Sequence, residues 1–162
     1  MSDGGLVVRE GRRPPMPAIV LGAAGLLPLI LALLVRLAAG ADPDTPLPGM
    51  IGGLALAYSA MILSFLGGAW WGVASARASA EEQPRLLAIA VVPSILALLL
   101  YGLSADAPVI CSTLLGLVIA ATPLVDHMLD RRRLVPAWWM NLRLPLSLAL
   151  GALTIGLGFA LV

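Results

Sequence analysis

Residues 51–76 read IGGLALAYSAMILSFLGGAWWGVASA, an uninterrupted apolar stretch without a single charged residue. Its length exceeds the roughly 20 apolar residues that a helix needs to span a bilayer. Across the whole chain 60% of the residues are hydrophobic and the mean hydropathy is +0.99, which is more than the core of a soluble domain requires. The stretch therefore predicts a transmembrane helix.

Four further stretches have the same character, and all of them are continuously apolar and rich in leucine and alanine. A membrane β-barrel would instead show segments of about ten residues in which apolar and polar side chains alternate. We therefore predict an all-α, polytopic membrane protein, built as a bundle of five transmembrane helices. The predicted helices cover about residues 18–38, 51–76, 86–103, 109–127 and 144–162.

The segments between these helices are too short to form a second, soluble domain. Residues 1–17 combine glycine, charge and a run of prolines, which predicts a disordered cytoplasmic arm. Residues 18–162 then form one five-helix membrane domain. Prolines inside three predicted helices each remove a backbone hydrogen bond and favour a kink, at Pro28, Pro93 and Pro123.

The arginines are distributed unevenly along the chain, which contains no lysine. Nine of the ten arginines lie in segments 1–17, 77–85 and 131–143, which fall on one side of a protein with five spans. Arg36 is the exception. By the positive-inside rule the N-terminus is cytoplasmic and the C-terminus lies outside, in a bacterial inner membrane. We read this charge as a topology signal, so the expected partner is the lipid bilayer and not a nucleic acid.

Small residues recur every four positions along the stretch 51–76. Such positions share one face of a helix, where the lack of side-chain bulk lets another helix approach closely. We interpret this face first as a packing seam inside one subunit. A dimer seam and a groove for a lipid or quinone tail are the alternatives. The predicted seam consists of Ala60, Ser64, Gly68, Gly72 and Ala76.

Asp126 is the one acidic residue that the pattern draws toward the membrane, because the apolar run before it is short for a bilayer core. A carboxylate at a helix C-terminus is disfavoured by the helix dipole, so we expect an arginine partner. Arg143 is the first choice and Arg77 the second. Such a pair is either a structural contact that closes the cytoplasmic end or a polar site that binds an anionic headgroup or relays a proton. An exposed, unpaired Asp126 is the third reading.

The string ILSFLGG at residues 62–68, preceded by Tyr58 and followed by Trp71-Gly72, resembles the signature of the domain of unknown function 3429 family, whose animal member is transmembrane protein 69. The family often places a histidine directly before the Trp-Gly, where this chain has Trp70. The resemblance implies a small, multi-helix inner-membrane protein and brings no established reaction with it. Later residues that match the family pattern are Pro93, Ser94, Asp126, Pro136, Trp138, Leu142 and Arg143.

The resemblance also bears on the tryptophans, which all map to the inner boundary of the membrane. Tryptophan is enriched there in any membrane protein, so an aromatic belt is the simplest interpretation. Trp71 and Trp138 match family positions, which implies an alternative in which they line a ligand pocket together with Asp126 and Arg143.

No catalytic motif is present. The single histidine, His127, and the single cysteine, Cys111, lie at opposite ends of one predicted helix and cannot build a metal site. We therefore expect no catalytic residue, no metal and no cofactor. The function that follows is a non-enzymatic accessory or assembly component that contacts other membrane helices or copies of itself. The alternative is a small transporter, channel or lipid- or quinone-binding protein that uses the Asp, Arg and Trp residues at the cytoplasmic side.

Overall fold

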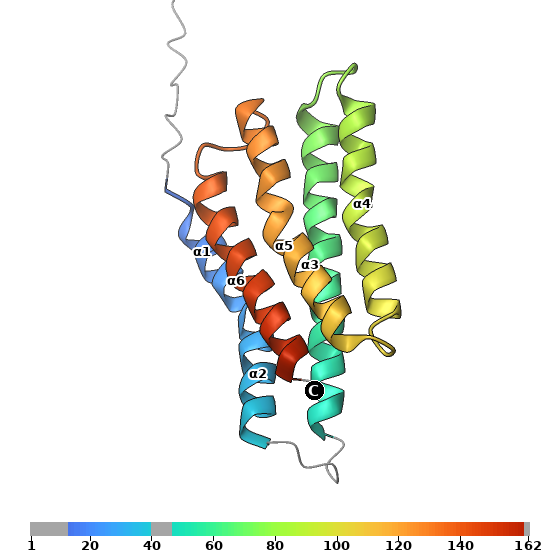
Figure 1. Cartoon of the computed structure of the whole chain (residues 1–162). Helices are drawn as coiled ribbons and strands as arrows, with labels where there is room; N and C mark the ends of the chain where they lie inside the picture. Colours follow the sequence, from blue (N-terminus) through green and yellow to red (C-terminus); the bar gives the residue numbers. More distant parts are fainter. Residues whose placement is uncertain (1–12, 40–46, 161–162) are drawn as a thin grey trace, which may run out of the picture.

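The computed structural model describes residues 13–39 and 47–160, and these form helices and short connections without any strand. Five spans among them are long and apolar enough to cross a membrane, which confirms the predicted all-α, polytopic fold. The expected arm lies outside the described residues as far as residue 12. The helices are α1 (Met16–Ala24), α2 (Leu27–Ala39), α3 (Leu47–Arg77), α4 (Gln83–Gly102), α5 (Pro108–Arg131) and α6 (Trp139–Ala160) (Figure 1).

The first span consists of two helices, because the chain is interrupted between α1 and α2. Pro28 explains the interruption, since it has no N–H and its ring would clash with the carbonyl of Ala24 in a continuous helix. The hydroxyl of Tyr58 on α3 donates a hydrogen bond to the carbonyl of Gly25 at 2.9 Å. The kink favoured at Pro28 thus takes the form of a break, whereas α4 and α5 continue through Pro93 and Pro123. At the break, a neighbouring helix supplies a hydrogen bond that lipid cannot.

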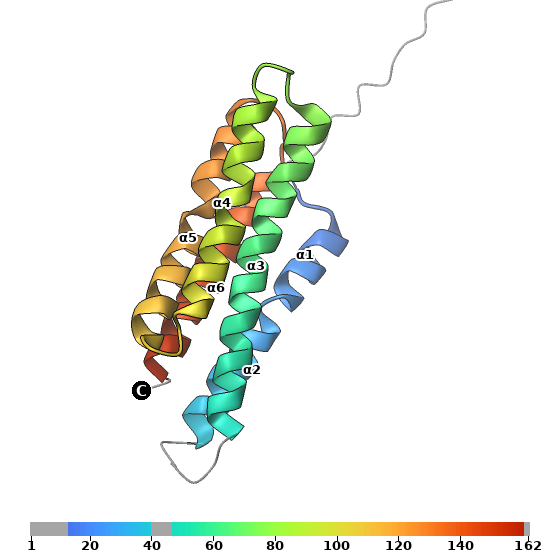
Figure 2. The same ribbon diagram turned by 90° about the vertical axis from the view of Figure 1, so that its right-hand side faces the viewer.

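Two antiparallel hairpins form most of the bundle, α3 with α4 and α5 with α6, and both turn at the same end (Figures 1 and 2). The helix α2 packs against α3 and α6, and α1 packs against α6. Five crossings therefore bring the start of α1 and the two hairpin turns toward one end, which we call the arginine-rich end. Its arginines among the described residues are Arg13, Arg77, Arg85, Arg131, Arg132 and Arg133.

Arg36, the exception to the arginine asymmetry, lies at the opposite end of the bundle. Its Nε donates a hydrogen bond to the carbonyl oxygen of Ala160, at the C-terminal end of α6, over 2.9 Å. The last carbonyls of a helix have no partner within the helix, and an arginine satisfies both their hydrogen bonding and the negative end of the helix dipole. This arginine therefore joins α2 to α6.

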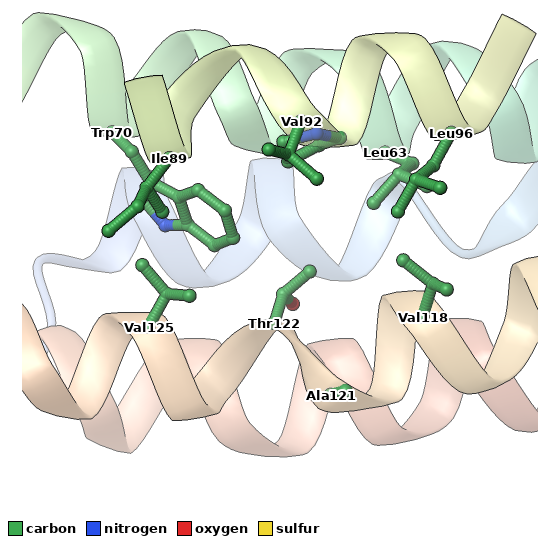
Figure 3. A pocket seen from close by; sticks show the side chains of 10 residues that line it. Leu63, Trp70, Ile89, Val92, Leu96, Val118, Ala121, Thr122 and Val125 are labelled. Atoms are coloured by element: carbon green, nitrogen blue, oxygen red, sulfur yellow. The ribbon is translucent and has the colours of Figure 1, made fainter. Parts of the chain in front are cut away.

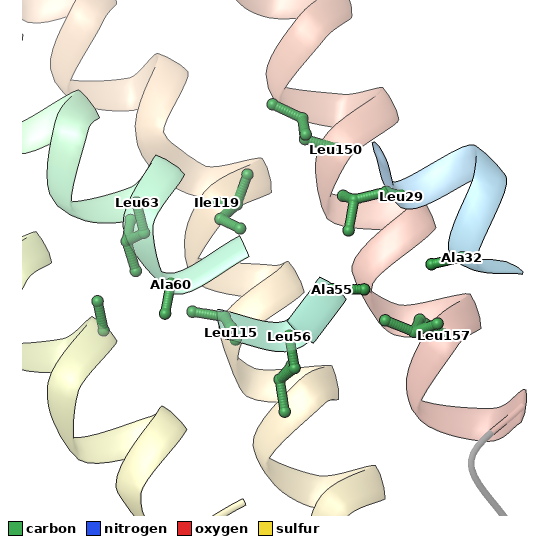
Figure 4. Packing of buried hydrophobic residues seen from close by; sticks show 11 residues of the cluster. Leu29, Ala32, Ala55, Leu56, Ala60, Leu63, Leu115, Ile119, Leu150 and Leu157 are labelled. Carbon is green, nitrogen blue, oxygen red and sulfur yellow. The ribbon is translucent and has the colours of Figure 1, made fainter. Parts of the chain in front are cut away.

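The centre of the bundle is filled by leucine and isoleucine from α2, α3, α5 and α6 (Figure 4). Leu63, Leu115 and Ile119 are all completely buried. The two helices of the second hairpin approach each other at Gly116 and Gly151, where an added Cβ on either glycine would lie 2.6 Å from the carbonyl oxygen of the other. Small residues thus bring these helices together, as is common in lipid.

Only the first half of the predicted seam on α3 packs within the subunit, where Ala60 lies in the core and the hydroxyl of Ser64 forms a hydrogen bond with that of Ser94 on α4 at 2.9 Å. Ala60 is buried and Ser64 is partly buried, but Gly68, Gly72 and Ala76 are exposed. A Cβ added to Gly68 or Gly72 would meet nothing within 4 Å.

The close contact of α3 is made instead by Gly67, one residue earlier. A Cβ there would run into the carbonyl oxygen of Ala90 and would lie 3.2 Å from the side chain of Pro93 on α4. Because a helix turns by about 100° per residue, a shift of one position moves a glycine from the core to the outer surface.

The turn between α5 and α6 places the start of α6 beside the end of α5. Arg133 has a φ of 57°, and the amide of Leu134 donates to the carbonyl of Leu129 at 3.0 Å, which closes the last turn of α5 in a Schellman motif. Leu129 and Leu134 also lie in one buried cluster. The chain therefore reverses tightly, and the first turns of α6 pack against the last turns of α5.

Candidate functional site

Asp126 lies five residues before the end of α5 and its side chain is 0% exposed. An unpaired carboxylate in such a place is strongly disfavoured, so its partners determine what it can do. Three donors from two other helices reach it. We call Asp126 and these donors, Trp70, Trp139 and Arg143, the Asp126 cluster.

Two indoles share one oxygen of the carboxylate. The Nε1–H of Trp70 on α3 donates to Oδ1 of Asp126 at 2.9 Å, and the Nε1–H of Trp139 on α6 donates to the same atom at 3.0 Å. Hydrogen bonds to an ionised acceptor are about twice as strong as bonds between neutral groups. The carboxylate therefore links α3, α5 and α6.

Arg143 supplies the positive charge. Its Nε donates to Oδ2 of Asp126 at 3.0 Å, and its side chain is only 11% exposed. The guanidinium also lies 5.7 Å from the ring centre of Trp139, four residues earlier on the same face of α6, in cation–π geometry. Nη2 of Arg143 is buried and has no hydrogen-bond partner among the described residues. This nitrogen is therefore a buried donor of the cluster whose hydrogen bonding is not satisfied within the described residues.

The Asp126 cluster is a buried group of hydrogen bonds and one ion pair near the arginine-rich end. The charges compensate each other, and both oxygens of the carboxylate accept hydrogen bonds. Removing one partner of such a pair leaves an uncompensated buried charge, which typically costs about 3 to 5 kcal/mol. Holding three helices in register is the role that this geometry performs directly.

Two further buried polar contacts continue from the cluster toward the other end. Thr122 and Ser147 join α5 to α6 at 3.1 Å, and Ser59 and Thr154 join α3 to α6 at 3.0 Å. Each hydroxyl pair also donates to a backbone carbonyl, so these groups are satisfied where they lie. Their arrangement stabilises helix packing.

The expected ion pair between Asp126 and Arg143 is present, and its use as a ligand site stays a prediction. Arg77, the second choice, lies elsewhere and donates to the carbonyl of Leu134 at 3.4 Å. Trp71 is 48% exposed on the outer side of α3, and Trp138 contacts the ring of Trp139 with 5.9 Å between centres. Trp71 therefore lies away from Asp126, and Trp138 reaches the carboxylate only through its neighbour Trp139. The alternative in which these two tryptophans line a ligand pocket stays a prediction.

Trp70 and Trp139, the tryptophans that do contact Asp126, are the chain neighbours of the two that were expected. A signal for Trp139 was available, because it precedes Arg143 by four residues and so lies on the same helix face. Trp70 lies three residues after Gly67, on the buried face of α3, but nothing in the sequence marks that face as buried.

Residues 13–39 and 47–160 contain no group of three His, Cys, Asp or Glu side chains that could hold a metal ion. Cys111 is buried near the start of α5, whereas His127 is exposed near its end. The two side chains are separated by most of the length of this helix.

These features define a small polytopic membrane protein whose spans are held together near one end by a buried carboxylate. The chain belongs to the family described as Protein of unknown function (DUF3429), whose model matches residues 14–159. No curated protein and no solved structure matches the chain.

Proposed function

We propose that this protein is a non-enzymatic accessory or assembly component of a bacterial inner membrane, and that it acts by binding another transmembrane helix on the outer face of α3. The observation that carries the proposal is the open space at Gly68 and Gly72, where an added Cβ would meet no atom within 4 Å. These glycines contribute no close contact to the subunit, although a glycine costs helix stability.

The spacing of the two glycines is that of the GxxxG motif, which lets the backbones of two membrane helices approach closely. Larger apolar side chains continue the same outer face, since Met61 is 70% and Phe65 is 69% exposed. A partner helix would find a shallow notch at the glycines with bulky contacts beside it. The expected occupant is a transmembrane helix from a second copy or from another membrane protein.

The Asp126 cluster supports this reading over a transport or catalytic role. Its carboxylate is fully buried and already accepts three hydrogen bonds within the chain. A proton relay would need this carboxylate to exchange its partners, and Nη2 of Arg143, which has no partner among the described residues, is a nitrogen donor that carries no ionisable carboxyl of its own. Because the Asp126 cluster links α3, α5 and α6, it instead favours a rigid bundle whose outer α3 face is available to a partner helix.

Cysteine cross-linking in native membranes tests the proposal. In a background with Cys111 replaced by Ala, Gly72→Cys should form a defined cross-linked product, whereas Leu124→Cys on α5, which is 75% exposed in the wild type, should not. Gly68→Leu should abolish the product without changing the thermal stability of the detergent-purified protein. Equal cross-linking from both cysteines, or a product that survives Gly68→Leu, would exclude this face as the docking surface.

The orientation is part of the same proposal, with the arginine-rich end in the cytoplasm. Reporter fusions after Glu82 and Arg132 should report the cytoplasmic side, and a fusion after Ala105 should report the opposite side. An external reporter after Arg132 would reverse the proposed topology.

A further inference from the structure

An apolar groove of about 210 Å³ lies between α4 and α5, with its floor formed by α3 (Figure 3). Ile89 and Val92 line the α4 side, and Val118 and Val125 line the α5 side. Trp70 extends across the floor toward the arginine-rich end (Figure 3). The groove therefore touches the Asp126 cluster through the indole of Trp70 but presents almost only carbon.

The groove opens sideways, at the depth of the membrane. Val92 is 48% exposed at its rim, and Ala121 on α5 is exposed as well. The hydroxyl of Thr122, which also lines the groove, is bound to the carbonyl of Ile119 and to Ser147. Since both flanking helices cross the bilayer, the medium at this opening is lipid hydrocarbon.

The volume of the groove suits part of one acyl or prenyl chain. A single turn of a helix, about 5.4 Å long and about 10 Å wide with its side chains, occupies roughly 400 Å³, which is more than the volume of the groove, about 210 Å³. The groove also differs from the outer face of α3, because the α3 residues that line it, Leu63 and Trp70, are both buried.

Positive charge follows at the arginine-rich end of the groove. Arg85 precedes Ile89 by four residues, so it lies on the same face of α4 about 6 Å further along. It is exposed, and no residue within 13–39 and 47–160 forms an ion pair with it. Arg132, seven residues after Val125 and directly after the end of α5, pairs with Glu82 at 2.5 Å. An apolar groove thus leads to an unpaired guanidinium.

We propose that the groove and Arg85 together bind a phospholipid with an anionic headgroup, with one acyl chain between α4 and α5 and the phosphate beside Arg85. The groove and Arg85 follow each other in the same order as the acyl chain and the phosphate of a phospholipid, because the groove lies at membrane depth and Arg85 lies toward the membrane surface. A neutral quinone would use the groove but leave the arginine without a counter-charge. The charge complementarity therefore favours the anionic lipid.

The test uses the purified full chain in detergent, titrated with phosphatidylglycerol or phosphatidylcholine of identical acyl chains. Apparent affinity is measured by thermal shift and by native mass spectrometry of bound lipid. We expect the wild type to prefer phosphatidylglycerol. Arg85→Gln should weaken phosphatidylglycerol binding about fivefold, as expected for one arginine near an anionic surface, and leave phosphatidylcholine binding unchanged. Arg13→Gln, at the same end but three residues before α1, is the matched control and should keep the preference.

Larger side chains in the groove test whether it holds the acyl chain of the lipid. Ala121→Leu should weaken the binding of both lipids, whereas Ala152→Leu, at another exposed alanine on α6, should not. Val92→Phe at the rim gives a second, independent way to fill the groove if Ala121→Leu folds poorly. The proposal is overturned if the alanine variants behave alike, if the wild type binds both lipids equally, or if a neutral quinone displaces phosphatidylglycerol at equal concentration.

Discussion

The two sides of α3 carry nearly the same residues and have opposite roles. Its inner side presents Gly67 and Trp70, which contact α4 and Asp126, whereas its outer side presents Gly68 and Trp71, which contact nothing comparable among the described residues. The members of each pair are neighbours in the chain. Residue type therefore does not tell which of these residues contacts the rest of the bundle. The position of each residue around the helix axis decides it.

The same contrast recurs at the start of α6. Trp139 donates to Asp126 and lies under Arg143, while Trp138 only contacts the ring of Trp139. Both helices thus place one tryptophan of a consecutive pair on the carboxylate. The same substitution made at each member of such a pair should therefore change stability at the inner residue and not at the outer one.

The largest effect should come from the acceptor that the inner tryptophans share. Asp126→Asn should destabilise the protein by about 3 to 5 kcal/mol, because it leaves Arg143 buried without a counter-charge. Arg143→Gln should cost a similar amount. The double variant should lose less than the sum, as thermal unfolding in detergent can measure. Strict additivity would mean that the pair does not stabilise the inner side as a unit.

The glycine pair should give the next largest difference. Gly67→Leu should cost about 3 kcal/mol or more, because the added atoms would run into the backbone of Ala90 and force α3 and α4 apart. Gly68→Leu should leave the free energy of unfolding unchanged within about 0.5 kcal/mol, since the space around it is open. If both variants unfold at the same temperature, the assignment of inner and outer sides is incorrect.

The tryptophan pair tests the hydrogen bond alone. Trp70→Phe keeps most of the ring but removes the donor to Asp126, so we expect a loss of about 2 kcal/mol. Trp71→Phe should have almost no effect on stability. Trp70→His restores an N–H at this position and should recover part of the loss. A histidine variant no more stable than the phenylalanine variant would show that the ring, and not the donor, is what the site needs.

The serines of α3 should show the smallest contrast. Ser59→Ala removes an inner hydroxyl that binds Thr154 at 3.0 Å, and such contacts in membranes average about 0.6 kcal/mol. Ser75→Ala, on the exposed side, should be neutral. Thermal shifts averaged over repeated measurements resolve this difference, and a larger effect at Ser75 would contradict the assignment.

The sequence by itself determined the architecture and part of the site. Five uninterrupted apolar stretches fixed the five spans, because a bilayer excludes charge from that length of helix. The arginine asymmetry indicated which connections share an end. Asp126 and Arg143 could be paired in advance, since a charge at the edge of an apolar helix needs a partner and few were within reach.

Only the tertiary structure decided which side of each helix faces inward. In a soluble protein a polar face marks the outside, but lipid is as apolar as a protein core, so both sides of α3 can carry Gly, Trp and Phe. The contacts at Gly67 and Trp70 depend on where Ala90 and Asp126 lie on other helices, and no local pattern contains that information. The rotation of each helix is set by close packing with its neighbours, which exists only once the bundle has formed.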